Sequence, residues 1–468
     1  MAIEVQGRRR AAPLTNELGR YMQNRRSFLS FAGAGLVAMG CKGALASSAF
    51  REDAGNPERR LWHVEAFGSG RSKVGSGGDD TAALQSALDS GEMIDVTGAL
   101  LRISDTINVN YPGANVSSVM ASRVGNRASS KIRVSENSMP RLFNVSAANF
   151  EASGFFVECD AGNAVTTLFH FERPAGAAAD IDAVISRVGT EGGGKIFHIY
   201  GRGLKLDGCT FANTKIAVGD LDFPVSWTPN GSSNETQETA MRAYQFDNLR
   251  FHGVAAGVRN VGRNSLNCGG IQMTNIHGDI GIGGGGAFVG VARDGQFANI
   301  LSRMGATHGG GIVDLHDGSS NCAFTNLGNG GFKGADVARL VRNPIVIRSG
   351  PIGVNELSFI GGTIGPCNRN GVHILGHGKA QNIAFLGIAF DRTNIEGNQY
   401  FPIKVEESGG AFAEVSIKLG ACNFKFRRET PAACILGGLN SAVVTLYRDN
   451  LTTKPKGIPW TQSNIVVG

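Results

Sequence analysis

The sequence predicts an all-β protein built as a parallel β-helix, a solenoid in which short strands stack coil upon coil. Three observations support this prediction. A short segment of alternating apolar residues recurs eight times in the second half of the chain. The spacing of the copies suits coils with loops of variable length. The composition is rich in glycine and poor in charge.

Each copy of the recurring segment contains alternating apolar residues, usually followed by Asn or Gly. The copies are LKLDGC (204–209), YQFDNL (244–249), IQMTNI (271–276), QFANIL (296–301), CAFTNL (322–327), LSFIGG (357–362), IAFLGI (383–388) and VSIKLG (415–420). Alternate residues of a strand face the same side, so the apolar ones share an interior. Asn and Gly tolerate the left-handed backbone conformation. Each copy therefore predicts a strand, a sharp bend and a second strand.

One apolar residue in each copy serves as a marker of its coil. The markers are Leu206, Phe246, Met273, Phe297, Phe324, Phe359, Phe385 and Ile417, at intervals of 40, 27, 24, 27, 35, 26 and 32 residues. A β-propeller is the main alternative, but its blades run to about 40–45 residues. A β-sandwich also uses short strands, without a recurring Asn in the middle of the segment.

The composition agrees with stacked strands. Glycine accounts for 67 of 468 residues, with 18% charged and 7% aromatic residues. That glycine share is about twice the ordinary one. No second domain is visible in the composition, so residues 47–468 are expected to form one β-helix domain.

The first 46 residues resemble an export signal. Arg25 and Arg26 precede a short apolar stretch (31–40) and an Ala-Leu-Ala site at 44–46. This order is typical of a signal peptide, and the paired arginines resemble the twin-arginine type. We therefore expect export by the twin-arginine translocase and a periplasmic or secreted protein. Two alternatives are a basic amphipathic helix of the mature protein and a lipoprotein anchored at Cys41.

The basic charge of the chain lies mostly in that segment. Residues 1–46 contain seven basic and two acidic residues, a net +5 of the +6 of the whole chain. The remainder is close to neutral, so the charge does not indicate a nucleic-acid partner.

Seven cysteines follow Cys41, and no two of them form a C-x-x-C pair. They are Cys159, Cys209, Cys268, Cys322, Cys367, Cys422 and Cys434. We interpret them as small buried apolar residues, with a disulfide or two left open and no zinc site.

Residues 62–110 carry a family resemblance. The stretch GGDDTAALQSALDSGEMIDVTGALLRISDTINV resembles the opening of the pectate-lyase superfamily of right-handed β-helices, which includes phage tailspike depolymerases. The resemblance implies a right-handed helix closed by a short capping helix, with coils over about residues 110–450. Asp79 or Asp80 can cap this helix, and Leu84 and Leu88 would cover the apolar interior. A trimer, as in tailspikes, is left open.

In that superfamily, chemistry usually lies on the outward face of the first strand of each coil, just before each marker segment. Four successive coils carry polar residues there. These are Asp314, His316 and Asp317, then Arg348, then His373 and His377, then Glu406. At the inter-strand spacing such a stripe would extend over about 15 Å. The expected substrate is a polysaccharide, such as a bacterial exopolysaccharide.

The sequence favours a glycoside hydrolase. Asp314 and Asp317 would act as the two carboxyl groups, and His316 would orient or bind the sugar. Asp317 can instead begin a turn, because Gly-Ser-Ser follows it. The other residues, Arg348, His373, His377 and Glu406, would bind substrate.

Two other functions stay open. A polysaccharide lyase would use a basic group to remove a proton from a uronate, and it could need Ca²⁺; otherwise no metal or cofactor is expected. A non-catalytic carbohydrate-binding or matrix protein is the third. Trp227, in the long interruption at 219–243, could stack on a sugar or anchor its own loop.

Overall fold

The structure is a computed structural model. It describes residues 61–63, 78–91, 93–97, 99–117, 130–134, 139–159, 167–172, 180–200, 202–222, 244–261, 269–280, 285–304, 311–329, 342–391, 393, 400–426, 433–438, 444–462 and 465–467. The chain divides into two units, Met1–Ser48 and Ala49–Gly468. The first unit lies wholly outside the described residues, as do the twin arginines and Cys41, so export remains a prediction. Of the helices in the described ranges, none is both long and apolar enough to cross a membrane.

The second unit is an all-β, right-handed parallel β-helix, as the sequence predicted. Its described strands pair in parallel and form three sheets, here called the first, second and third sheet in the order in which a coil visits them. The first sheet contains β4 (Ile107–Val109), β7 (Arg141–Val145), β10 (Thr167–Glu172), β13 (Lys195–Tyr200), β16 (Ile216–Asp222), β19 (Ala256–Asn260), β21 (Phe288–Gly290), β23 (Val313–Leu315), β25 (Ile345–Ser349), the first halves of β27 (Val372–Leu386) and β29 (Ile403–Gly420), β31 (Ile435–Gly438) and β33 (Thr461–Gln462).

The second sheet holds the recurring segments. It contains β1 (Leu61–His63), β2 (Met93–Asp95), β5 (Asn115–Ser117), β8 (Glu151–Ser153), β11 (Asp180–Ser186), β14 (Arg202–Asp207), β17 (Tyr244–Asp247), the first halves of β20 (Ile271–Ile280), β22 (Gln296–Met304), β24 (Ser320–Asn329) and β26 (Val354–Ile364), the second halves of β27 and β29, β32 (Val444–Arg448) and β34 (Ile465–Val467).

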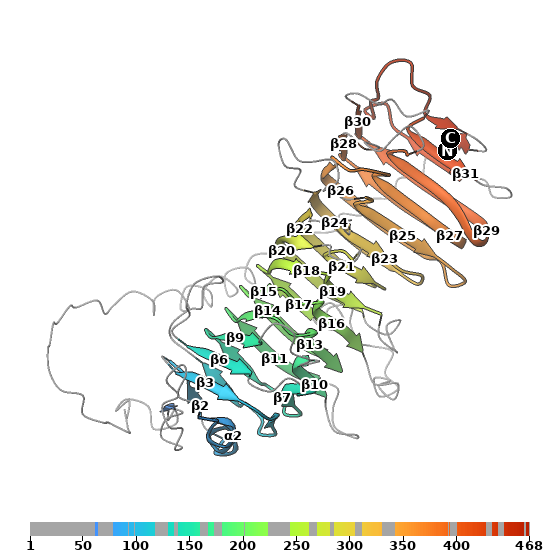
Figure 1. The fold of residues 1–468 in the computed structure, drawn as a ribbon. Coiled ribbons are helices and arrows are strands. Elements are labelled where there is room, and N and C mark those ends of the chain that lie inside the picture. Colours follow the sequence, from blue (N-terminus) through green and yellow to red (C-terminus); the bar gives the residue numbers. More distant parts are fainter. Residues whose placement is uncertain are drawn as a thin grey trace, which may run out of the picture. The chain divides into compact units, whose positions relative to one another are not determined.

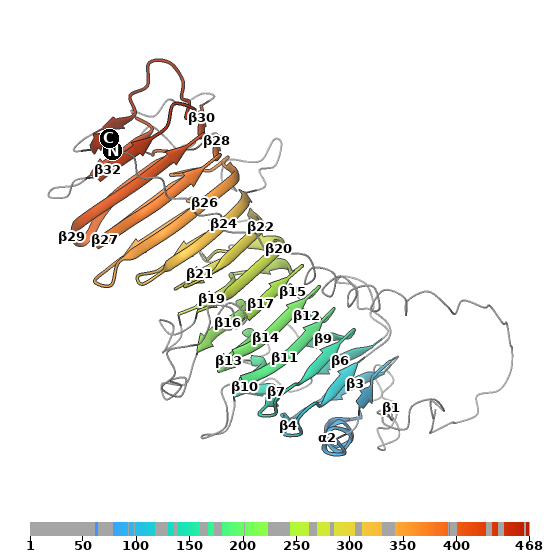
Figure 2. The same cartoon turned by 180° about the vertical axis from the view of Figure 1, so that it is seen from behind.

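The third sheet follows the bend. It contains β3 (Leu100–Ile103), β6 (Lys131–Val134), β9 (Phe156–Cys159), β12 (Gly189–Glu191), β15 (Thr210–Ala212), β18 (Arg250–Val254), the second halves of β20, β22, β24 and β26, β28 (Ala389–Asp391) and β30 (Asn423–Lys425). Figures 1 and 2 show these strands following one another in chain order, from the blue strands beside helix α2 to the red strands of the last coils.

The predicted bend between the second and third sheets is confirmed at every copy of the segment except the last. The residue two after the marker has a positive φ in each of these seven: Gly208 (64°), Asn248 (56°), Asn275 (56°), Asn299 (55°), Asn326 (53°), Gly361 (64°) and Gly387 (66°). This left-handed conformation costs little for Gly and Asn, which explains their recurrence.

The last copy was placed two residues too early. Ile417 lies opposite Ile383, and Leu419 takes the place opposite Phe385. The bend falls at Ala421, whose φ is 52°. A shift of two residues keeps every apolar side chain on the same face, so the alternating pattern could not distinguish the two registers. Because the bend residue is Ala, no Asn or Gly marked the position of the bend in the sequence.

Asparagines at the bend bond to one another from coil to coil. Asn248 donates to Asp207 at 2.9 Å, and the side-chain amides of Asn275, Asn299 and Asn326 continue the series at 3.3, 3.1 and 2.9 Å. Each amide donates to a side-chain oxygen of the preceding coil, so the bend is stabilised by neighbours as well as by local conformation.

The marker residues line a shared apolar interior, as predicted. Phe297, Phe324, Phe359 and Phe385 stack with ring centroids 4.5, 4.7 and 5.0 Å apart. All four are buried. Stacked rings at nearly the inter-strand spacing follow directly from strands in register.

The predicted capping helix is α2 (Thr81–Asp89). Leu84 and Leu88 are buried, as expected for a cover over the apolar interior. Asp80 occupies the N-cap position without a side-chain cap bond, whereas Asp79 accepts the Thr81 amide at 3.0 Å. The Gln85 side chain exchanges two hydrogen bonds with the backbone of Asn108 in β4. The helix thus provides hydrogen-bond partners for backbone groups of β4, at the exposed edge of the first sheet.

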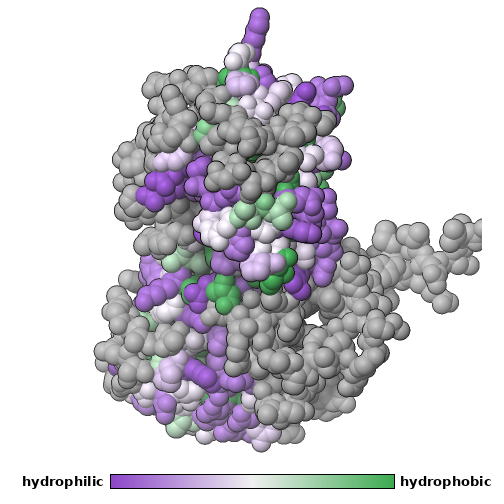
Figure 3. Space-filling model, turned by 90° about the vertical axis from the view of Figure 1, so that its right-hand side faces the viewer, coloured by the Kyte–Doolittle hydropathy of each residue, from purple (hydrophilic) through white to green (hydrophobic). Residues whose placement is uncertain are grey.

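The cysteines and the exterior fit the same architecture. The six described cysteines that follow Cys41 are buried, as predicted, and burial raises the pKa of Cys209 and Cys322 to about 12. Cys268 lies outside the described residues. The exterior is mixed: on the side drawn in Figure 3, hydrophilic residues lie among paler and hydrophobic ones.

Candidate functional site

The first sheet brings most of the predicted site residues together. Asp314 of β23 lies opposite Val346 of β25, which lies opposite His373 of β27, which lies opposite Lys404 of β29. Arg348 and Glu406 lie two residues further along their strands, on the same outward face. The predicted polar stripe is therefore one face of four adjacent strands.

Asp314 and Arg348 form a two-pronged ion pair in this stripe. Arg348 Nε donates to one carboxylate oxygen at 2.7 Å and Nη2 to the other at 2.9 Å. The Asp314 side chain is only 11% exposed, while that of Arg348 is 48% exposed. The hydrogen bonds to Asp314 raise the pKa of Arg348 above its ordinary value. The carboxylate is thus held by the cation, and about half of the Arg348 side chain remains exposed.

His316 flanks this pair. Its Nε2 lies 3.7 Å from Asp314 Oδ1, and its side chain is 32% exposed. Burial lowers the pKa of His316, although the charge of Asp314 opposes this effect. The imidazole is therefore neutral at pH 7.

His373 forms the second arrangement in the stripe. Its Nε2 lies 2.8 Å from Glu406 Oε2, and Lys404 Nζ lies 2.7 Å from the same oxygen. Burial lowers the pKa of His373, with Glu406 acting in the opposite direction. The hydrogen bond from Lys404 is the largest influence that lowers the pKa of Glu406. The result is a neutral imidazole bonded to an ionised carboxylate, with an ammonium group on that carboxylate.

We call the six residues of the stripe the His373 cluster. Its members are Asp314, His316, Arg348, His373, Lys404 and Glu406. They come from strands β23, β25, β27 and β29 and the residue after β23. Three inter-strand steps separate the first strand from the last, roughly 14 Å.

Asp317, His377 and Trp227 are placed differently. Asp317 accepts the backbone amides of Gly350, Ile352 and Gly353 at 2.8, 3.2 and 2.7 Å, so it fixes a turn in the next coil. His377 lies beyond the cluster on β27, where its Nδ1 is 3.4 Å from the Ser408 carbonyl. Trp227 lies outside the described residues. The structure does not bring Asp317 and His377 into the contacts of the His373 cluster.

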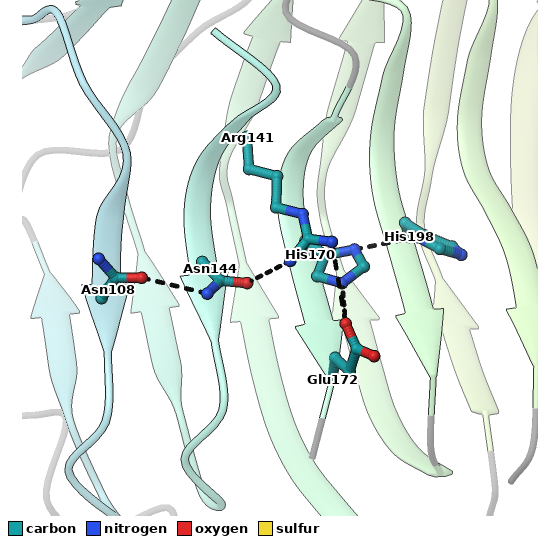
Figure 4. A network of polar contacts seen from close by, with 6 residues as sticks. All are labelled: Asn108, Arg141, Asn144, His170, Glu172 and His198. Atoms are coloured by element: carbon teal, nitrogen blue, oxygen red, sulfur yellow. Dashed lines mark hydrogen bonds and ion pairs between the residues drawn. The ribbon is translucent and has the colours of Figure 1, made fainter. Parts of the chain in front are cut away.

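A second cluster lies on the first sheet and was not predicted. We call it the His170 cluster; its members are Asn108, Arg141, Asn144, His170, Glu172 and His198. Figure 4 shows these side chains projecting from strands β4, β7, β10 and β13 toward one another. His170 is the hub: its Nε2 lies 2.8 Å from Glu172, and its Nδ1 lies 2.9 Å from His198 Nδ1.

Arginine and amide groups extend this hub toward the capped end. Arg141 Nη1 donates to Asn144 at 2.8 Å, and Asn144 donates to Asn108 at 3.1 Å. Arg141 Nη2 lies 3.8 Å from Glu172. These contacts form one continuous network over four coils (Figure 4).

Burial distinguishes the groups of the His170 cluster. The His170 side chain is 5% exposed, whereas those of Glu172 and Arg141 are 50% and 38% exposed. Burial lowers the pKa of His170, and the hydrogen bond from His170 lowers the pKa of Glu172. Since an ionised carboxylate only accepts hydrogen bonds, His170 Nε2 carries the proton and His198 Nδ1 donates to His170 Nδ1.

The sequence contained one sign of this cluster. Phe-His-Phe at 169–171 and Phe-His-Ile at 197–199 place a histidine between inward apolar residues, 28 residues apart. That interval is one coil, and the two histidines lie opposite each other in β10 and β13. The recurring segment was recognised only from residue 204 onward, so these coils were not searched for outward polar residues.

Metal binding finds no support in the described coils. Among the residues that the structure describes, no group of three or more His, Cys, Asp or Glu side chains is arranged to hold a metal ion. In the His373 cluster the carboxylates of Asp314 and Glu406 each pair with a cation. That donor set does not fit Ca²⁺, which prefers six to eight oxygen ligands.

Comparison with known proteins finds distant structural likenesses. No protein-family model and no curated protein matches the chain. Tailspike protein 2 of the Escherichia coli O157:H7 bacteriophage CAB120 is 14% identical over 83% of this chain, with a TM-score of 0.41. This chain spans 42% of that tailspike's length.

Two further solved structures are similar to the same degree. The A-module of mannuronan C-5 epimerase AlgE6 from Azotobacter vinelandii is 11% identical over 87% of this chain and 99% of its own, with a TM-score of 0.40. The catalytic unit of a GH87 alpha-1,3-glucanase from Streptomyces thermodiastaticus is 11% identical over 89% of this chain and 72% of its own, with a TM-score of 0.39.

Proposed function

We propose that this protein processes a polysaccharide on the outward face of its first sheet, and that it acts as a lyase on a glycan containing uronate. One observation carries the proposal: the neutral His373, held by Glu406 and accompanied by Lys404, lies on the face that also presents Arg348. A neutral base beside cationic groups is what proton removal next to a carboxylate requires.

His373 supplies the base in this proposal. Its Nε2 donates to Glu406, so the lone pair resides on Nδ1. Burial keeps the pKa of His373 below its ordinary value, which leaves the ring unprotonated at pH 7. Glu406 fixes the tautomer and stabilises the imidazolium once the proton has been taken.

The neighbouring cations supply the rest of the chemistry. Arg348 binds the uronate carboxylate through its exposed edge and neutralises the charge that develops as the C5 proton leaves. The C4–O bond breaks, a C4–C5 double bond forms, and the departing oxygen takes a proton from Lys404. His373 gains one proton and Lys404 loses one, so the step balances without an oxidant, a reductant or a metal.

Hydrolysis by paired carboxyl groups, which the sequence favoured, fits the contacts less well. A general acid needs a carboxyl whose pKa is raised. The pKa of Glu406 is lowered instead, chiefly by Lys404. Asp314 bonds Arg348 through both oxygens, and Asp317 accepts three backbone amides. Neither aspartate is positioned as a group that gives up a proton.

The test is product analysis on a panel of neutral and uronate-containing polysaccharides. The proposal expects an absorbance in the near ultraviolet from unsaturated uronate, together with new reducing ends. New reducing ends without that absorbance would identify a hydrolase. Binding with neither product would identify a carbohydrate-binding protein, and either result overturns the lyase assignment.

We also propose export by the twin-arginine route, which would place the protein where extracellular glycans occur. The paired Arg25 and Arg26 before the short apolar stretch support this step. Replacing both arginines by lysine should leave the full-length precursor inside the cell, detectable by immunoblotting of fractions. Normal export of that variant would contradict the route.

A further inference from the structure

We infer that the His170 cluster is a second binding site for the same glycan, so that one extended anionic chain is held at two places along the first sheet. This inference rests on the proposed function for the class of substrate. Its support comes from the register of the sheet, from the exposed groups of the cluster, and from the residues that separate the two clusters.

The two clusters share one register row of the first sheet. Asn108, Asn144, His170 and His198 lie opposite one another in β4, β7, β10 and β13. From His198 the row crosses a register irregularity between Phe197 and Ile199 to Gly219, the residue after Val218. It continues through Arg259, the residue after Val258, to Val289 and Asp314. It then reaches His373. Both clusters therefore face the same direction.

The separation suits a long oligosaccharide. From His170 to His373 the row passes through seven inter-strand steps, roughly 33 Å at the spacing of parallel strands. A single sugar cannot reach across this distance, whereas an extended chain lying along the axis can contact both ends. Each site then raises the effective concentration of the glycan at the other.

The exposed groups of the His170 cluster are suited to an anionic sugar chain. Arg141 is 38% exposed and offers donors to a carboxylate, while the half-exposed Glu172 and the amide of Asn108 can bond hydroxyl groups. The buried His170 bonds Glu172 on one side and His198 on the other, so it positions the groups that would touch the sugar. His170 is a positioning residue in this account.

Between the clusters the row contains Gly219, Arg259 and Val289, so two of its three residues are small. Gly219 has no side chain, and a Cβ there would lie 2.9 Å from Ile216 and 3.3 Å from Arg259. Val289 presents a short aliphatic side chain one step before Asp314. A sugar chain can pass over Gly219 and Val289 without obstruction, and it passes beside the partly buried, cationic Arg259 between them.

The experiment measures affinity against chain length. Oligouronates of increasing length are titrated by calorimetry into the wild-type protein, Arg141→Gln and a control, Arg250→Gln. Arg250 is an exposed arginine of the third sheet, opposite Thr210 and so on another face. Wild type and control should show an affinity gain of at least about 10²-fold once the ligand reaches both clusters.

In Arg141→Gln that length-dependent gain should fall at least tenfold. An undiminished gain in Arg141→Gln overturns the second site and leaves the proposed function intact. No gain with length in the wild type also overturns it, again without touching the His373 cluster. Failure of every oligouronate to bind the wild type overturns the inference and the proposed substrate class together.

Discussion

The His373 and His170 clusters contain the same kinds of side chain, a histidine, a glutamate and a cation, in surroundings that differ in burial. In each, a histidine Nε2 lies 2.8 Å from a glutamate oxygen with a cation beside it. The His373 side chain is 16% exposed and contacts Glu406 of the next coil. His170 is 5% exposed and is covered by a second histidine. Under the proposed function, the same pair serves as a base where the ring is partly exposed and as a support where it is almost fully buried.

Removing the reachable histidine should have the largest effect. His373→Ala deletes the proposed base and should lower turnover of a uronate polymer by about 10²–10⁴-fold, the usual contribution of general base catalysis. The near-ultraviolet product absorbance measures this rate. His277→Ala is the matched control, since His277 is an exposed histidine of the third sheet opposite Arg250.

The His277→Ala protein should keep wild-type turnover. If His373→Ala also kept wild-type turnover, His373 would not be the catalytic base and the proposed difference between the two clusters would be wrong.

Asp317 offers the next largest effect, on stability. Asp317→Ala removes three backbone hydrogen bonds of the turn at 350–353 and should cost about 1–3 kcal/mol. The apparent unfolding temperature should fall, and the folded fraction should retain its turnover. Lost turnover with an unchanged unfolding temperature would instead make Asp317 a catalytic carboxyl and would favour the two-carboxylate hydrolase.

Acid should destabilise the protein partly through His170. Burial holds the folded-state pKa of His170 below the ordinary value of about 6.5, so the unfolded chain takes up this proton first as the pH falls. The stabilisation that the neutral His170 ring provides is therefore fully present above pH values of about 6.5 and is lost as the pH falls further. The groups acting on the ring include Glu172, Arg141 and Lys195.

Apparent unfolding temperatures at pH 7.5 and pH 5.5 test this effect. The wild-type protein should lose several degrees between the two, and His170→Gln should lose less because its side chain does not titrate. An equal loss in both proteins would show that His170 is not the buried neutral hub.

The smallest effect concerns the bend at Ala421, between the second and third sheets. Ala421 has a φ of 52°, where a Cβ costs up to about 1 kcal/mol. Ala421→Gly should raise the apparent unfolding temperature slightly and keep the bond from its amide to Asp449. A decrease would mean that the methyl group makes a contact worth more than the strain.

The fold could be predicted because its code is local and repeated. In segments such as 296–301 and 322–327, the alternating apolar residues predict a strand with one face in the interior, and the Asn within the segment predicts the bend. Because the same pattern recurs in each coil, every copy supports the same prediction. The register failed only where Ala421 replaced Asn or Gly at the bend. Helix α2 was predicted from the resemblance of residues 62–110 to the opening of the pectate-lyase superfamily. Leu84 and Leu88, one turn apart behind two aspartates, agree with it.

The site was predicted only in part, because its contacts join residues from different coils. Asp314, Arg348 and His373 were placed on one face by the period of two, and the strand register confirms that placement. The sequence spacing could not predict that Asp314 pairs with Arg348, 34 residues later in the chain. It also could not predict that Asp317 accepts backbone amides of the next coil. The His170 cluster was missed because its strands precede the first recognised copy.

A structure of His373→Ala with a bound oligouronate would test the central claim most directly, because substrate can occupy the site without being consumed. The account predicts a sugar chain lying across β23, β25, β27 and β29, with a uronate carboxylate on Arg348 and its C5 facing the space left by the imidazole. A chain bound on the second or third sheet, or no contact with Arg348, would contradict it.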